Sequence, residues 1–144
     1  MASPVEVQII LCDAAVADPT GKVHMLGAGW SVTTSPTPPQ AVAVLVKVPW
    51  DRANQRLGIR LQLVDSDGAA VLLETPQGQQ GITAEGELEV GRPPGVAPGS
   101  LLDASFVVSL QPLPLPPGRY QWRLDVSEQT FAASFQVRQG GTAP

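Results

Sequence analysis

The sequence predicts an all-β protein: one immunoglobulin-like antiparallel sandwich of about eight or nine strands, with a jelly roll as the alternative. Three observations support this fold class. Apolar and polar residues alternate with the period of two that a half-buried strand requires. The 15 prolines and 14 glycines cluster between these runs, where they favour turns. No segment indicates a helix longer than a single turn. At 144 residues the chain has a usual length for one domain, so we expect residues 1–144 to form one sandwich.

In the first half of the chain, strands are expected at residues 5–12, 22–33 with a bulge at Gly27 and Gly29, 41–48, 57–64 and 69–73. Residues 18–21 and 65–68 have the proline, aspartate and glycine content of tight turns. The 41–48 run is apolar on both faces apart from Lys47, which favours a central strand covered on each side. Residues 49–54 interrupt the pattern, and we expect Asp51 to cap a single helical turn there.

In the second half, strands are expected at residues 85–90, 104–110, 119–126 and 130–137. Three glutamates share one face of the 85–90 run, so we expect that face to be solvated. The 119–126 run has the cleanest alternation, with Tyr120 and Trp122 on the inward face. We expect a mobile loop at 76–80, rigid proline-rich connectors at 91–95 and 112–117, and a frayed tail at 138–144.

Charge and composition narrow the classes of partner. The formal net charge is −4, and only two of the nine basic residues are lysines, Lys22 and Lys47. Nucleic acids and anionic membranes bind clustered lysine and arginine, which this chain lacks, so we expect neither as a partner. The first six residues do not resemble a signal peptide, and the longest apolar stretch, 41–46, is too short to span a bilayer. We therefore expect a cytoplasmic protein, a location that a virion component made in the cytoplasm would share.

No combination of residues indicates catalysis, a cofactor or a bound metal. His24 is the only histidine and Cys12 the only cysteine, which excludes a multi-histidine metal site and an intrachain disulfide. As a base, His24 would have to serve Cys12 or one of the serines, and a thiol at the end of an apolar strand such as Cys12 is ordinarily buried. Residues 65–68 lack the later ligands of a calcium loop, and 27–29 lack the third glycine and the helix of a dinucleotide site. We expect a protein that is not an enzyme and carries no cofactor.

A set of short motifs extends over nearly the whole chain: Leu11-Cys12-Asp13-Ala14-Ala15, Gly21-Lys22, Leu26-Gly27-Ala28-Gly29-Trp30, Pro49-Trp50-Asp51, Asn54, Gly91-Arg92-Pro93-Pro94-Gly95 and Pro117-Gly118-x-Tyr120-x-Trp122. Together they are similar to the pattern of an uncharacterised bacterial domain family of unknown function, found mostly in high-GC, actinobacterial-type organisms. The resemblance implies a single small β-sandwich and supplies no catalytic or binding residues. The preference for alanine, proline and arginine over lysine fits a high-GC genome.

Five residues of these motifs are candidates for an interaction surface: Trp30, Trp50, Asp51, Asn54 and Arg92. Tryptophan and arginine are enriched where proteins bind one another, and loops at one end of a sandwich often carry binding sites. The alternative is structural, with Asp51 capping a turn, Arg92 tying down a loop and the tryptophans plugging the ends of the sandwich.

The sequence leaves three classes of function open. We favour a non-enzymatic module that binds another protein through loops or an exposed sheet edge. The first alternative is a structural subunit of a homo-oligomeric assembly or virion, whose function is self-association. The second is a carbohydrate or small-ligand binding domain, which requires a pocket lined by Trp30 or Trp50 together with acidic residues. The expected partner is therefore another protein or a second copy of the chain.

Overall fold

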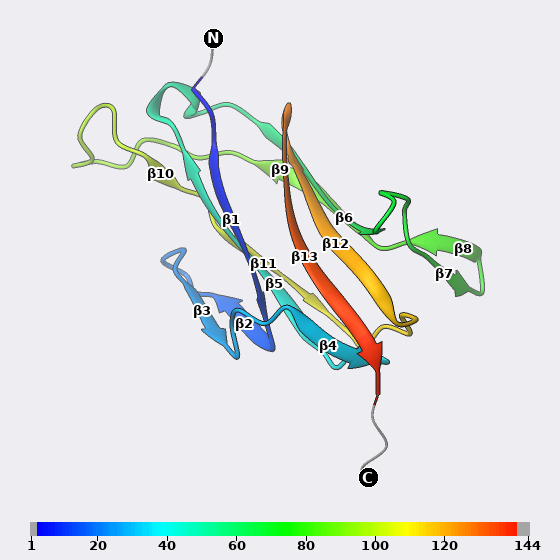
Figure 1. The fold of residues 1–144 in the computed structure, drawn as a ribbon. Helices are drawn as coiled ribbons and strands as arrows, with labels where there is room; N and C mark the ends of the chain where they lie inside the picture. Colours follow the sequence, from blue (N-terminus) through cyan, green and yellow to red (C-terminus); the bar gives the residue numbers. More distant parts are fainter. Residues whose placement is uncertain (1–2, 141–144) are drawn as a thin grey trace.

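Two β-sheets form the core of the computed structural model, which describes residues 3–140 (Figure 1). The first sheet has four strands, with β5 between β1 on one side and β10 and β11 on the other: β1 (Glu6–Cys12), β5 (Gln40–Val48), β10 (Leu102–Asp103) and β11 (Phe106–Leu110). The second has five, in the spatial order β4 (Val32–Ser35), β13 (Gln129–Gln139), β12 (Gly118–Val126), β6 (Leu57–Asp65) and β9 (Thr83–Leu88). Among the strands of residues 3–140, only β4 and β13 pair in parallel. The all-β sandwich predicted from the sequence is confirmed.

The alternation of apolar residues places one face of each long strand in the core. On β5 the inward residues are fully buried, and they are Val42, Val44, Val46 and Val48. On β12 the predicted inward face is also buried, and it consists of Tyr120, Trp122, Leu124 and Val126. Removing one such side chain from water stabilises a fold by about 1.5–3 kcal/mol, which makes the alternation a stronger determinant than local propensity. The expectation that β5 is central is confirmed, because β1 and β11 flank it.

A hairpin covers part of the outer face of the first sheet (Figure 1). It consists of β2 (Ala14–Ala17) and β3 (Val23–Leu26). Its inward residues Ala15, Val23 and Met25 pack on a second, smaller core made of Cys12, Ala41 and Ala43. The small side chains of this second core let the hairpin approach the sheet closely. The sequence does not predict β2, because the four residues Ala-Ala-Val-Ala show no contrast between an apolar and a polar face.

The segment after β6 differs from the prediction. We expected a strand at 69–73 and a loop at 76–80, whereas the structure has a second hairpin, β7 (Leu72–Thr75) and β8 (Gly78–Gly81). Ala70 forms only an isolated bridge with Val64. The Gly-Gln-Gln-Gly sequence of β8 has low strand propensity, so its conformation depends on pairing with β7.

The turns expected at aspartate residues are present. The Asp65 carboxylate accepts hydrogen bonds from the N–H groups of Asp67 and Ala69, at 2.9 and 3.0 Å, and Gly68 has a φ of 81°. The Asp65 carboxylate therefore stabilises the turn at residues 65–68, as the sequence predicts. At the C-terminus β13 continues to Gln139, through the first two residues of the expected frayed tail, and residues 141–144 lie outside the described residues.

Candidate functional site

The loops at one end of the sandwich bring together four of the five candidate residues. A single 3₁₀ turn, η1 (Trp50–Arg52), follows β5 and carries Trp50 and Asp51. Asn54 comes directly after this turn, and Arg92 lies in the connection between β9 and β10. We call Trp50, Asp51, Asn54 and Arg92 the apical surface.

Arg92 and Trp50 form the centre of the apical surface. The Arg92 guanidinium lies 4.5 Å from the centroid of the Trp50 ring, and its Nη2 donates a 2.7 Å hydrogen bond to the Trp50 carbonyl. Trp50 is half-buried and packs against the main core, whereas Arg92 is exposed. Stacking and hydrogen bonding together hold a long, flexible side chain in one place on the protein surface.

Asp51 does not cap η1 as the sequence suggested. The N-cap is Pro49, and no side chain bonds the first turn. The Asp51 carboxylate instead accepts hydrogen bonds from the N–H and the Oγ of Ser3, at 3.3 and 3.1 Å. The bond from the Ser3 N–H lowers the pKa of Asp51, and Asp51 thereby joins the start of the chain to the apical loops.

Asn54 shapes the backbone of the apical surface. It has a left-handed φ of 62°, a conformation that asparagine tolerates better than most residues, and its side chain is exposed. Its N–H donates a 2.7 Å hydrogen bond to the Val90 carbonyl. This bond anchors the loop that carries Arg92 beside η1, which explains how residues 42 apart in sequence come into contact.

A shallow hollow of about 530 Å³ adjoins the apical surface. Its lining residues are Ser3, Pro4, Glu6, Pro49, Trp50, Asp51, Gly99 and Leu101. Leu101 is 47% exposed, so an apolar side chain borders the Trp50–Arg92 pair on the protein surface. Trp50 and Leu101 therefore line one concave patch, and Arg92 lies next to it on the Trp50 ring.

Trp30, the fifth candidate, lies toward the other end of the molecule. Its ring packs edge-on against Phe135, with centroids 5.8 Å apart, close to where Ser31 bonds Gln136 of β13. The apical turn η1 contacts the opposite end of β13, through Arg52 and Glu128. Seven residues separate Glu128 from Phe135, roughly 23 Å at the rise of about 3.3 Å per residue. The five candidates therefore do not share one surface.

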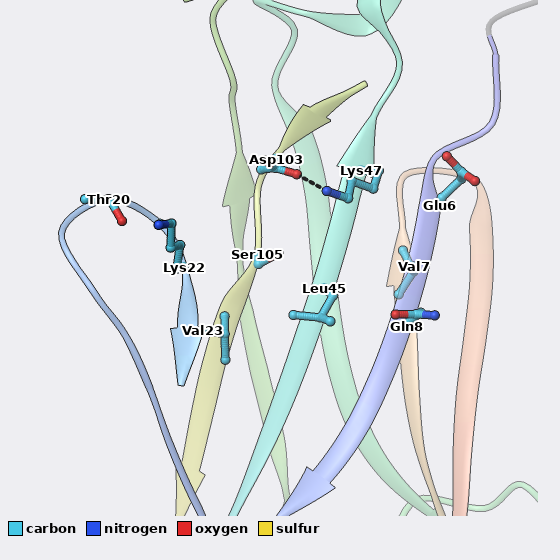
Figure 2. A pocket seen from close by; sticks show the side chains of 11 residues that line it. Glu6, Val7, Gln8, Thr20, Lys22, Val23, Leu45, Lys47, Asp103 and Ser105 are labelled. Carbon is cyan, nitrogen blue, oxygen red and sulfur yellow. Dashed lines mark hydrogen bonds and ion pairs between the residues drawn. The ribbon is translucent and has the colours of Figure 1, made fainter. Parts of the chain in front are cut away.

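A second hollow, of about 650 Å³, lies between the β2–β3 loop and the outer face of the first sheet. Figure 2 shows Thr20 and Lys22 on one side and Glu6, Gln8 and Lys47 on the sheet. Both lysines of the chain line this hollow, but the Lys47 ammonium is bonded to Asp103, and Glu6 lies opposite Lys47 in register. The charge of Lys47 is thus compensated within the protein by Asp103.

Comparison with protein families finds one family model that matches almost the full length of the chain. A family model described as a family of unknown function, DUF6941, matches residues 8–138, from within β1 to the end of the sandwich. The chain belongs to DUF6941. No curated protein matches it. The DUF6941 match includes the whole apical surface, from Trp50 to Arg92.

The motifs near the start of this DUF6941 chain build the β2–β3 hairpin. The Asp13 N–H donates to the carbonyls of Leu26 and Gly27, at 3.0 and 3.3 Å, where the hairpin joins β1. Gly27 has a φ of 60°, and a Cβ there would overlap the Asp13 carboxylate. The positive φ therefore favours glycine at this position, and a Cβ there would force the Asp13 carboxylate to move.

The cysteine and histidine of this DUF6941 chain lie on opposite sides of the hairpin. Cys12 is fully buried beneath it, and burial raises the pKa of its thiol. His24 is exposed, beside exposed Val16 on the outer side, and its Nε2 lies 2.8 Å from the Asp18 carboxylate. Within residues 3–140, no three histidine, cysteine, aspartate or glutamate residues come together as a metal site, and no helix has the length and apolar character to cross a membrane.

One residue important to the apical loops, Arg52, was not identified from the sequence. It is only 5% exposed, and its guanidinium contacts Glu128 Oε1 at 3.4 Å and Ser127 Oγ at 3.5 Å. These contacts connect η1 to the β12–β13 turn. The sequence offers no signal for this role, because an arginine in a loop is ordinarily exposed.

Proposed function

We propose that this protein is a non-enzymatic module that binds another protein through the apical surface. The observation that carries the proposal is the Arg92 guanidinium stacked on Trp50 beside the exposed Leu101. Tryptophan and arginine are enriched among the residues that dominate the binding energy of protein interfaces, and they contribute most where the surrounding contacts exclude water from them.

The arrangement of Arg92 also favours binding. An arginine side chain loses rotamer entropy when an interface immobilises it. Here the stacking on Trp50 and the 2.7 Å hydrogen bond restrict the side chain before any partner arrives. The guanidinium still has unused N–H donors, which can reach a carboxylate or carbonyl of a partner. A partner with an acidic or carbonyl-rich loop matches this surface.

Carbohydrate binding is the less favoured use of the same hollow. Trp50, Asp51 and Glu6 all line it, as a sugar site would require. However, Arg92 covers one face of the Trp50 ring, and the indole also packs against the core. A sugar would need to displace the guanidinium before it could stack on that face.

We propose further that the sandwich is of the immunoglobulin type. Support comes from Tyr120 on β12, whose Oη donates a 2.5 Å hydrogen bond to the Pro116 carbonyl. A tyrosine bonded to the backbone a few residues earlier, at the start of the penultimate strand, is a hallmark of immunoglobulin-like sandwiches. Trp122 occupies the position two residues later, where antibody domains have a cysteine.

The proposed setting is the cytoplasm of a high-GC bacterium. A single buried, unpaired cysteine fits a reducing compartment better than a secreted one. The excess of arginine over lysine, with two lysines among nine basic residues, fits the genome type.

The experiment is quantitative affinity capture from an extract of the source cells, with wild type and two matched charge reversals. R92E changes the apical surface, and R119E makes the same charge change at an exposed arginine at the start of β12, far from it. We expect a defined protein that wild type and R119E retain equally and R92E loses at least tenfold. Equal retention by all three proteins would remove the apical surface as the binding site.

A further inference from the structure

One outer strand of the sandwich, β11, carries no charge or proline that would oppose pairing with another chain, although β2 lies beside it over the outer face of the sheet. β11 bonds to β5 along one edge, and in the described residues no strand pairs with its other edge. Its sequence, Phe-Val-Val-Ser-Leu, has no charge, no proline and a high strand propensity. Natural proteins usually place charges, bulges or proline on such an edge, because a bare edge is a template for another strand.

The other outer strands are protected. Exposed Glu85 and Glu87 occupy β9. The backbone edge of β1 is used internally, because the Leu11 carbonyl accepts from the Gly29 N–H at 2.8 Å and the Val5 N–H donates to Gln129 at 2.8 Å. β4 has only four residues and ends where the Ser35 hydroxyl donates to the 112–117 crossing, at Leu115. On β1, Val7 and Ile9 also direct backbone groups away from β5, but β1 begins with the charged Glu6. β11 is therefore the one outer strand of at least five described residues that carries no charge.

The alternation of hydrogen bonds along β5 shows which residues of β11 direct their backbone N–H and C=O groups away from β5. On β5, the Val46 N–H donates to Ser105 Oγ and the Val46 carbonyl accepts from the Ala104 N–H, so both groups point toward β10 and β11. Backbone groups alternate in direction along an antiparallel strand. Val44 and Val42 therefore also direct their groups toward β11.

The same alternation determines the direction of the backbone N–H and C=O groups on β11. Phe106 lies opposite Val44 and Val108 opposite Val42, so these β11 residues bond to β5. Val107 and Ser109, the alternate residues, direct their N–H and carbonyl groups away from β5. Two residues thus offer two donors and two acceptors at the free edge.

We propose that a second copy of this chain pairs with β11, antiparallel and with Val108 on the two-fold axis. In this register Val107 of each copy lies opposite Ser109 of the other, so the two donors and two acceptors of each edge find partners. Phe106 lies opposite Leu110 of the second copy, and the two Val108 residues face one another. No charge meets a like charge. Phe106, Val108 and Leu110 lie opposite apolar side chains, and Val107 lies opposite the small side chain of Ser109. The strand is complementary to itself.

The pairing has a consequence for the arrangement of the two copies. It joins the two first sheets into one continuous sheet. Because β10 and then β11 run away from the apical end of β5, and the two paired β11 strands run in opposite directions, the two apical surfaces lie at opposite ends of the dimer. A dimer of this kind could hold two partner molecules at once. The inference does not depend on the apical surface being a binding site.

The test is the solution mass by light scattering after size exclusion, over a concentration series up to the millimolar range. S109P removes an N–H that points away from β5, so it removes a donor from the edge and leaves the pairing with β5 intact. S109T is the matched control, because it keeps the N–H and a residue suited to strands. Circular dichroism checks that both variants keep the fold.

We expect the wild-type mass to rise from 15.1 kDa toward about twice that value, and S109T to behave in the same way. S109P should remain at 15.1 kDa, with at least a tenfold weaker association. Hydrogen exchange should show protection of the Val107 and Ser109 amides only at high wild-type concentration. A wild type that stays monomeric, an S109P that dimerises like wild type, or a dimer with unprotected Val107 and Ser109 amides would overturn the proposal.

Discussion

Arg92 contacts the same residue, Trp50, in two ways: its guanidinium lies 4.5 Å from the indole centroid, and its Nη2 bonds the Trp50 carbonyl at 2.7 Å. One side chain thus fixes both the ring and the backbone of its neighbour. The contact joins the β9–β10 connection to η1, two loops that are distant in sequence. The Arg92–Trp50 pair thus links two loops. Because Arg92 is exposed, the pair is also, in our proposal, the centre of a binding surface.

The first prediction concerns this pair. R92A should lower the free energy of unfolding by about 1 kcal/mol, the size of an exposed cation–π contact. R92K should recover only part of this loss, because lysine lacks the planar group that stacks and donates at once. Urea denaturation measures both values. An R92A protein as stable as wild type would show that the contact has no structural role.

The second prediction concerns the hydrogen bond from Tyr120 to Pro116. Y120F should lower the free energy of unfolding by about 1 kcal/mol, because the part-buried hydrogen bond to the Pro116 carbonyl is lost. Burial, followed by the charge of Asp65, raises the pKa of Tyr120 above 10.0. The folded state therefore favours the neutral phenol, and this contribution is present below pH 10.0 and is lost as the pH rises through the higher folded pKa.

The same pair of proteins tests the pH dependence. Denaturation of wild type and Y120F from pH 8 to about 11 should show a stability difference that shrinks only at the alkaline end. A difference that is constant to the alkaline limit would contradict the assignment of the titration to Tyr120.

The third prediction concerns the contact between Gly27 and Asp13. G27A combines a left-handed backbone with an overlap on the Asp13 carboxylate, and it should destabilise the protein by about 1–3 kcal/mol. G29A meets only the backbone cost, because its Cβ enters open space, so its effect should be smaller. In a D13A background, the cost of G27A should fall to that of G29A. Equal costs of G27A with and without Asp13 would rule out the overlap.

The fourth prediction concerns acid stability of the β2–β3 hairpin. A hydrogen bond from the Thr20 hydroxyl, then one from His24, lowers the pKa of Asp18 well below 3.8. The stability that Asp18 provides is therefore present above pH 3.8 and is lost as the pH falls through the lowered pKa. Wild type should exceed D18N in stability at neutral pH, and the difference should disappear in acid.

T20V tests the cause of that shift. It removes the hydroxyl that contributes most to lowering the Asp18 pKa, so the acid titration of Asp18 should move back toward 3.8. The carboxyl carbon shift of Asp18, measured by NMR during an acid titration, gives the midpoint directly. An unchanged midpoint in T20V would contradict the assigned cause.

The long strands could be predicted from the sequence because burial in the core imposes a regular alternation. β12 buries one face, and its sequence alternates between apolar and polar residues. β5 buries most of both faces, and its sequence is an almost continuous apolar run. β2 and β8 could not be predicted in this way. Ala14–Ala17 becomes a strand by packing on the small residues Ala41 and Ala43, and Gly78–Gly81 by pairing with β7. Tertiary contacts, which the local sequence does not record, decide both cases.

The candidate surface could be predicted only in part. Trp50, Asp51 and Asn54 are close in sequence, so their proximity followed directly, and Arg92 joined them through the β9–β10 connection. Trp30 was placed with them only because loops were expected to cluster, and strand order determines at which end of β13 each loop lies. The buried Arg52 had no counterpart in the sequence pattern, since a buried cation depends on partners from a distant turn.

The most direct test of binding through the apical surface is site-specific photocrosslinking in the source cells. A photoreactive amino acid replaces Leu101, which is 47% exposed beside Trp50, or Gln121, which is exposed on β12 of the other sheet. We predict that the probe at 101 forms a discrete crosslink to one protein other than this chain, and that R92E in the same chain abolishes it. The probe at 121 should form no such product. Identical crosslinks from both positions, or none from 101, would contradict the account.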